Sequence, residues 1–174
     1  MSVRWRAQPH GAELRPSLRA MTRQDIDAVM ALETAVYAFP WTRGNFVDSL
    51  VAGHMADVLR EGAQARLIGY FVALPGVEEM HLLNITIAPA CQRQGHCRRL
   101  LDELVERCRR RGAHRLWLET RESNLGARAA YARLGFAQEG VRPGYYPAAG
   151  GQRESAVLMS LRIDAQARPD DALG

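Results

Sequence analysis

Apolar residues recur along this chain with two different spacings, which together predict alternating strands and helices. From Cys97 to Cys108, apolar side chains follow the first at three, four, seven, eight and eleven residues, as on one face of a helix. Residues 80–87 form a short apolar segment rich in β-branched side chains that stops before Ala88 and Pro89, as a strand does. The loop at residues 92–97 therefore joins a predicted strand to a predicted helix.

The remaining elements follow from similar signals. Thr22 to Asp25 resembles a capping box and predicts a helix whose apolar side includes Ile26, Val29, Met30 and Val36. Thr42 is placed to cap a second short helix, and Asn124 to cap another that stops at Gly135. Further strands are expected at residues 18–21, 56–60, 64–74, 115–119, 136–141 and 155–163.

The chain length favours one domain. With 174 residues, the chain is long enough to bury a full core, and no repeat, low-complexity segment or linker divides it. We expect a single domain over residues 18–163. Residues 1–17 are expected to be a flexible N-terminal extension, and residues 164–174 a disordered tail.

The order of charges around the loop at residues 92–97 indicates an anion site. The helix that follows starts with cations (Arg93, Arg98 and Arg99), and its acidic residues come only from Asp102 onward. Acidic residues normally gather at a helix start, because it carries partial positive charge and unpaired N–H groups. A bound phosphate would explain the reversal. The residues alone leave open the alternative of a solvated turn with arginines facing water.

Composition excludes several classes of protein. The net charge is +4 and all 23 basic residues are arginine, but they are spread along the chain without a nucleic-acid-binding motif. Direct nucleic-acid binding is therefore not expected. No apolar run approaches the ~18 residues of a membrane span, and no secretory signal is visible, so we expect a cytoplasmic protein. Three cysteines with neither zinc nor disulfide spacing suit a reducing compartment and predict no metal site: Cys91, Cys97 and Cys108.

Seven short strings, in order along the chain, carry a resemblance to a known family. They are Ala38–Trp41, Asn84–Ile87, Gln92–Gly95, Leu116–Glu119, Ser123–Asn124, Tyr131 with Leu134–Phe136, and Tyr145–Pro147. Together they resemble the GNAT superfamily of acetyl-CoA-dependent N-acetyltransferases, and within it the bacterial ribosomal-protein-alanine N-acetyltransferases (RimI). The similarity runs from about residue 18 to residue 163. The GNAT signature wants Gly or Ala where this chain has Cys97, which we interpret as a thiol buried under the loop and tolerated there.

The resemblance implies a fold and a cosubstrate. The GNAT fold is an α/β fold with a mixed, mostly antiparallel seven-stranded sheet, splayed central strands and about four flanking helices. The cosubstrate is acetyl-CoA, with its pantetheine arm along the strand before the loop and its pyrophosphate on the loop itself. The matching positions are Ile85, Thr86 and Ile87 for the arm, Arg93, Gln94, Gly95, His96, Cys97 and Arg98 for the pyrophosphate, and Asn124 as a further contact.

Two residues match the family's catalytic positions. Glu119 ends a strand on the same face as Trp117, and a carboxylate beside an indole can be partly removed from water, which makes it a better base. The resemblance implies that Glu119 takes a proton from the acceptor amine and that Tyr131 donates one to the departing thiolate. The alternatives are that Glu119 is a strand-end glutamate facing solvent, and that Tyr131 packs with its hydroxyl on a backbone group.

Two aromatic, proline-containing segments are candidates for acceptor binding: Phe39, Pro40 and Trp41, and Tyr145 and Tyr146. Such loops could form a narrow slot for an extended peptide end, or could be ordinary hydrophobic anchors. The resemblance implies direct attack in a ternary complex by the N-terminal alanine of the small-subunit ribosomal protein eighteen. The alternatives are a GNAT that acetylates a small-molecule amine or a lysine, and a non-catalytic acyl-CoA-binding or ribosome-associated module.

Overall fold

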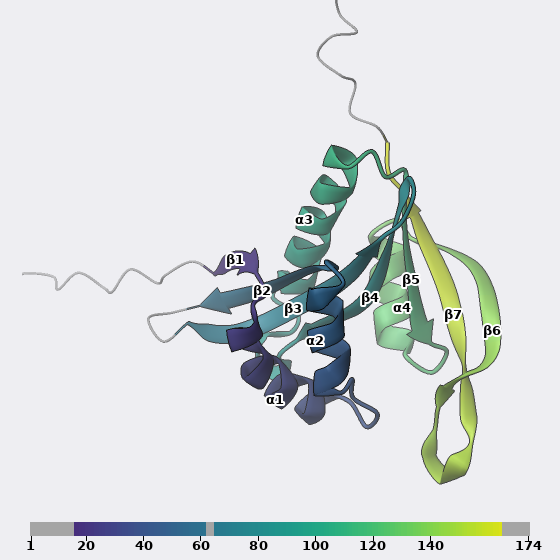
Figure 1. The fold of residues 1–174 in the computed structure, drawn as a ribbon. Coiled ribbons are helices and arrows are strands. Elements are labelled where there is room, and N and C mark those ends of the chain that lie inside the picture. Colours follow the sequence, from purple (N-terminus) through teal and green to yellow (C-terminus); the bar gives the residue numbers. More distant parts are fainter. Residues whose placement is uncertain (1–15, 62–64, 165–174) are drawn as a thin grey trace, which may run out of the picture.

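The computed structural model describes residues 16–61 and 65–164 and is built around a seven-stranded sheet with helices on both faces (Figure 1). The strands are β1 (Ser17–Ala20), β2 (Met55–Glu61), β3 (Arg66–Pro75), β4 (Glu79–Ile87), β5 (Arg115–Arg121), β6 (Ala137–Pro147) and β7 (Arg153–Arg162). The α-helices are α1 (Ile26–Val36), α2 (Arg43–Val51), α3 (His96–Arg110) and α4 (Leu125–Arg133), and short 3₁₀ turns lie at Arg23–Asp25, Pro89–Cys91 and Ala149–Gly151.

The strand order is β1-β2-β3-β4-β5-β7-β6. Every neighbouring pair is antiparallel except β4 and β5, which are parallel. The parallel ladder covers only residues 79–82 of β4 against residues 115–118 of β5. Both strands continue beyond it, so the middle of the sheet opens where they stop pairing. The expected mixed, mostly antiparallel sheet with splayed central strands is confirmed.

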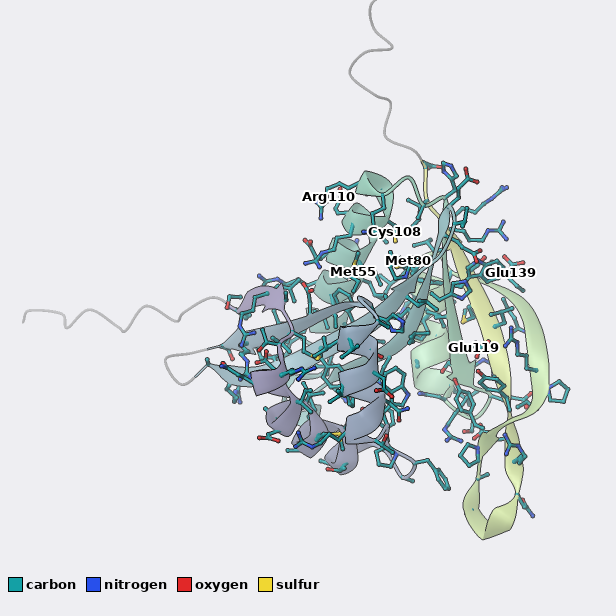
Figure 2. All side chains as sticks on the ribbon, in the orientation of Figure 1. Met55, Met80, Cys108, Arg110, Glu119 and Glu139 are labelled. Carbon is teal, nitrogen blue, oxygen red and sulfur yellow. The ribbon has the colours of Figure 1, made fainter. Side chains whose placement is uncertain are left out.

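Two apolar cores lie on opposite faces of the sheet. One core packs α1 and α2 against the first half of the sheet; its buried members include Ile26, Val29, Phe46, Val58 and Tyr70. The other packs α3 and α4 against the middle of the sheet, where Cys108 of α3 and Met80 of β4 belong to one cluster with Leu116 and Leu118 (Figure 2). The apolar stripe predicted from Cys97 to Cys108 is the side of α3 that faces this second core.

The predicted helix starts are confirmed by their capping bonds. The Thr42 side chain accepts a hydrogen bond from the Asn45 amide, and the Asn124 side chain accepts one from the Ala127 amide. The capping box at Thr22 and Asp25 is also present, although it opens a short 3₁₀ turn that leads directly into α1. These signals worked because each cap depends on residues within one turn of it.

Strand β6 is longer than predicted. The alternating pattern stops at Val141, but β6 runs on to Pro147 and pairs again with β7 at Tyr146 and Pro147. Between them the register shifts across Pro143, which has no N–H, and Gly144, whose φ is +58°. Because of this interruption, the sequence pattern did not predict the second half of β6.

Strand β1 begins at Ser17, one residue before the predicted strand. The predictions of a flexible extension and a disordered tail fall almost entirely on residues 1–15 and 165–174, outside the described residues. In the part of the chain that the structure describes, no helix combines the length and apolar character needed to cross a membrane.

Candidate active site

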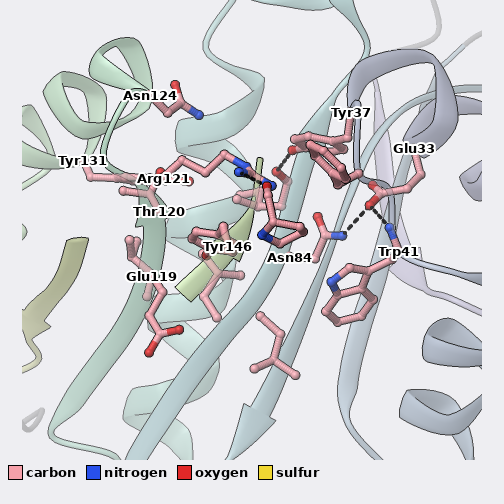
Figure 3. Close-up of a pocket in the computed structure, with 16 residues that line it drawn as sticks. Glu33, Tyr37, Trp41, Asn84, Glu119, Thr120, Arg121, Asn124, Tyr131 and Tyr146 are labelled. Carbon is pink, nitrogen blue, oxygen red and sulfur yellow. Dashed lines mark hydrogen bonds between the residues drawn. The ribbon is translucent and has the colours of Figure 1, made fainter. Parts of the chain in front are cut away.

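A cleft of about 300 Å³ opens where β4 and β5 stop pairing (Figure 3). The strands contribute Leu82 to Ile85 on one side and Leu118 to Arg121 on the other. The remaining lining residues come from elements around the gap: Glu33, Tyr37, Phe39, Trp41, Asn124, Tyr131, Tyr146 and Pro147. The cleft therefore collects side chains from five distant parts of the sequence.

Glu119 lies on β5 and faces this cleft. Along β5, Leu116 and Leu118 are buried in the core below α3, so Glu119 points to the opposite face of the sheet, as the alternation predicted. Its side chain is 21% exposed, and its Oε1 lies 2.8 Å from a guanidinium nitrogen of Arg142 on β6.

The Trp117 indole was expected beside the Glu119 carboxylate, but a different side chain contacts it. The Trp117 indole N–H donates to Glu79 at 2.9 Å, away from Glu119. Arg142 is the ion-pair partner of Glu119, and interaction with Glu119 raises the pKa of Tyr145 beside it. The carboxylate thus lies in a charged, hydrogen-bonding environment, because Arg142 of the edge strand β6 reaches it across β7, the strand between β6 and β5.

Tyr131 reaches the same cleft from the other face of the sheet. It belongs to α4, is buried, and packs its ring 5.7 Å from that of Phe136. Burial raises the pKa of its phenol, and the neighbouring groups of Cys97 and Tyr37 act in the same direction. Glu119 and Tyr131 therefore meet in one space through the gap in the sheet (Figure 3).

The aromatic segments are divided between the cleft and its rim. Phe39, Trp41 and Tyr146 line the cleft, whereas Pro40 and Tyr145 do not. The Tyr145 ring lies 5.0 Å from that of Tyr146 in an edge-to-face arrangement. Burial raises the pKa of Tyr146 to about 12, so its hydroxyl keeps its proton at neutral pH. The two segments do come together, as the slot hypothesis requires.

Glu33 was missed by the sequence analysis, although it is 1% exposed and lines the cleft. Its Oε1 accepts hydrogen bonds from the Trp41 amide at 2.8 Å and from the Asn84 side chain at 3.2 Å, and its Oε2 accepts one from the Tyr70 hydroxyl. The carboxylate thereby connects α1, the loop before α2 and two strands. Its signal in the sequence is a charged residue at the spacing of the apolar side of α1, between Val29 and Val36.

The strand segment expected to carry the pantetheine arm is only partly at the cleft. Ile85 lines it, whereas Thr86 and Ile87 are buried and do not. The Tyr37 hydroxyl donates to the Ile85 carbonyl oxygen at 3.3 Å and lies 3.0 Å from the Thr86 hydroxyl. Burial raises the pKa of Tyr37, so this hydroxyl is protonated near neutral pH.

The loop at residues 93–98 lies outside the lining of the cleft, at the start of α3. Gly95 occupies the N-cap position with φ +83°, and α3 has no side-chain cap there. A Cβ built on Gly95 would meet no atom within 4 Å, so the helix start faces open space. Cys97 is partly buried against the core, and this burial raises the pKa of its thiol. Cys97 therefore packs against the core, although it is only partly buried and not fully buried as expected.

The model of the acetyltransferase (GNAT) family matches residues 26–136, more than half of the chain. The chain belongs to the GNAT family. The match spans α1 to α4 and includes the loop at residues 93–98, so the predicted family and enzyme class are confirmed.

GNAT relatives of known name cover most of the chain. The ribosomal protein bS18-alanine N-acetyltransferase of Haemophilus ducreyi is 33% identical over 146 residues, 84% of this chain and 99% of the relative. That of Escherichia coli K12 is 33% identical over 147 residues, 84% of this chain and 97% of the relative. The crystal structure of the Escherichia coli ribosomal-protein-S18-alanine N-acetyltransferase superimposes with a TM-score of 0.78 and 32% identity, over 89% of this chain and 97% of that one.

GNAT acetyltransferases use acetyl-CoA, and the described residues fit such a cosubstrate. The start of α3 presents uncapped N–H groups to open space, which suits phosphate, and β4 is released from β5 beyond Leu82. Within residues 16–61 and 65–164, no cluster of His, Cys, Asp and Glu side chains is arranged to hold a metal ion.

Proposed function

We propose that this protein is an Nα-acetyltransferase that transfers an acetyl group from acetyl-CoA to the N-terminal alanine of ribosomal protein bS18. The observation that carries the proposal is the meeting of Glu119 and Tyr131 in one cleft, from opposite faces of a splayed GNAT sheet. The named relatives support the choice of acceptor, since they match nearly their whole length.

In this proposal the two residues handle the two protons of a direct attack. Acetyl-CoA supplies the acetyl group as a thioester. Glu119 accepts the proton that the N-terminal amine must lose, using the carboxylate oxygen that Arg142 does not occupy. Tyr131 donates its phenolic proton to the departing sulfur. One cleft holds both groups, which supports a ternary complex. In such a complex the amine attacks the thioester directly, and the acetyl group is never bound covalently to the protein.

The acetyl-CoA site is proposed along β4 and the start of α3. Residues with free backbone N–H groups near Gly95 would hold the pyrophosphate, and the cations at the loop would balance its charge. The proposed contact residues are Ile85, Thr86 and Ile87 for the arm, Arg93, Gln94, Gly95, His96, Cys97 and Arg98 for the pyrophosphate, and Asn124 in the lining of the cleft.

Gly95→Val should weaken acetyl-CoA binding. Valine at φ +83° strains the loop and adds a β-branched side chain where the pyrophosphate is proposed to approach, so we expect a loss of about tenfold or more in affinity. Isothermal titration with acetyl-CoA measures the change. Gly112→Val is the matched control, because Gly112 has φ +71°, equally open space, and lies at the far end of α3. Equal affinities for the two variants would contradict the placement.

The acceptor is proposed to enter as a thin, extended chain end. Phe39 and Trp41 form one wall of the cleft and Tyr146 belongs to the other, and aromatic walls suit a peptide backbone with a small first side chain. As an acceptor, an N-terminal amine also requires a weaker enzyme base than a lysine side chain does, because its pKa is lower. At pH 7.5 about a quarter to a third of N-terminal amines are neutral, against about a thousandth of lysines.

The test compares two peptides at equal concentration and pH. One has the N-terminal sequence of bS18 and begins with alanine; the other is N-terminally blocked and has an internal lysine as its only amine. We expect kcat/KM to be at least about a hundredfold higher for the alanine peptide, as the neutral fractions alone suggest. Preference for the lysine peptide, or for a free polyamine over both, would overturn the proposed acceptor and leave the GNAT assignment in place.

A further inference from the structure

Arg121 is the last residue of β5 and lines the cleft two residues beyond Glu119. Its guanidinium carbon lies 5.4 Å from the ring centre of Phe39 and 4.7 Å from that of Tyr146. A guanidinium at these distances from an aromatic ring is attracted to its face. Arg121 therefore contacts both aromatic segments that we propose as walls of the acceptor slot, and Figure 3 shows it in the cleft with Tyr146.

Polar contacts fix the orientation of this guanidinium. The Nη1 of Arg121 donates to the Pro147 carbonyl oxygen at 2.9 Å and to the Glu154 carboxylate at 3.1 Å. Glu154 is itself held, because its other oxygen accepts a hydrogen bond from the Ser123 amide at 2.7 Å. The side chains of Arg121 and Glu154 are only 27% and 20% exposed, so this ion pair is shielded from water more than a surface pair.

These contacts join segments that no strand pairing joins. Phe39 lies in the loop between α1 and α2, whereas Tyr146 and Pro147 end β6 on the far side of the opening in the sheet. Phe39 is 45% exposed, so its own burial does little to hold the loop. Arg121 contacts both segments from the strand between them.

We propose that Arg121 is a positioning residue that holds the two aromatic walls of the acceptor slot at a fixed separation. The inference rests on the proposed function, since it holds that Arg121 maintains the shape of the acceptor slot. By keeping the walls together, Arg121 restricts the slot to a narrow chain end. It performs none of the proton transfers, which belong to Glu119 and Tyr131.

Arginine suits this task better than lysine. A planar guanidinium can stack on an aromatic ring while its edge donates to a carbonyl and a carboxylate in the same plane. A lysine ammonium keeps the charge and can pair with Glu154, but it is a point charge without a face to stack. Arg121→Lys therefore removes the stacking on Phe39 and Tyr146 and keeps the positive charge.

Steady-state kinetics with the alanine peptide tests the role in binding. We expect Arg121→Lys and Arg121→Ala to raise KM for the peptide by about tenfold, with kcat and the affinity for acetyl-CoA within about twofold of the parent. Arg115→Lys is the matched control, since Arg115 lies on the same face of β5 and stacks 5.1 Å from the Trp117 ring, outside the cleft. A fall in kcat without a rise in KM would overturn the proposal.

Hydrogen exchange of the free protein, with no acceptor present, tests whether Arg121 holds the two aromatic segments in place. We expect Arg121→Lys to speed amide exchange in residues 38–42 and in residues 144–148 together, and Arg115→Lys to leave both unchanged. Unchanged exchange in either segment of Arg121→Lys would overturn the proposal. This result is decisive even if the parent protein fails to acetylate the alanine peptide, an outcome that would reject the proposed acceptor alone.

Discussion

Glu119→Gln is expected to lower turnover of the alanine peptide by about 10²- to 10⁴-fold, the usual cost of removing a general base. The amide has nearly the same shape but cannot accept the proton of the attacking amine. Affinity for acetyl-CoA should be unchanged, because the proposed cosubstrate contacts lie on β4, at the start of α3 and at Asn124, and do not include Glu119. Turnover at saturating acetyl-CoA and a separate titration measure the two effects.

Two controls separate the loss of the base from its side effects. Glu119→Gln also breaks the ion pair with Arg142, so Arg142→Gln, which breaks the same pair and keeps the carboxylate, should cost much less turnover. Glu122→Gln removes an exposed carboxylate just beyond β5, outside the cleft, and should leave turnover at the parental level. If Glu119→Gln kept near-parental turnover from pH 6 to pH 9, another group would have to take the proton.

Tyr131→Phe is the second change with a large expected effect. It removes the proposed acid and keeps the ring that packs against Phe136, so turnover should fall by about 10²-fold or more with little loss of stability. The loss should appear in kcat with acetyl-CoA affinity retained. Parental turnover in Tyr131→Phe would mean that the thiolate leaves without help from this residue.

The pH dependence of the parent protein gives an independent check on Tyr131. Burial raises the pKa of its phenol above the ordinary value, so the acid keeps its proton throughout the range in which an N-terminal amine, with a pKa of about 8, becomes neutral. Turnover should therefore rise as the amine loses its proton and stay level to pH 10. A decline with an apparent pKa near 9 that disappears in Tyr131→Phe would show that the phenol ionises too easily for this role.

Features that depend on neighbouring residues were predictable from the sequence. Thr42 and Asn124 cap their helices as expected, since a cap needs only the next turn of the chain. The alternation along β5 correctly separated Glu119 from the buried Leu118, because successive strand side chains point to opposite faces. The stripe of α3 was equally reliable, since its period of 3.6 residues is set by helix geometry.

Contacts between distant segments were not predictable in this way. The pairing of Glu119 with Arg142 depends on how β6 aligns with β7, and the predicted strand ended at Val141, one residue before Arg142. Glu33 was not singled out from the sequence, although its carboxylate accepts a hydrogen bond from the Trp41 amide at the cleft. Arg121 lies between two of the motifs and had no predicted role, since its partners Phe39 and Tyr146 lie far away along the chain.

The sequence by itself determined the family, the order of strands and helices, and the candidate acid, base and phosphate loop. All of these are recorded in local spacing and short motifs. Only the tertiary structure decided that β4 and β5 part after four residue pairs, and that Glu119 and Tyr131 enter the resulting gap from opposite faces. It also placed the Arg121 guanidinium between two aromatic segments. The reason is physical: periodicity tells which face a side chain occupies, whereas packing of distant segments determines what it meets there.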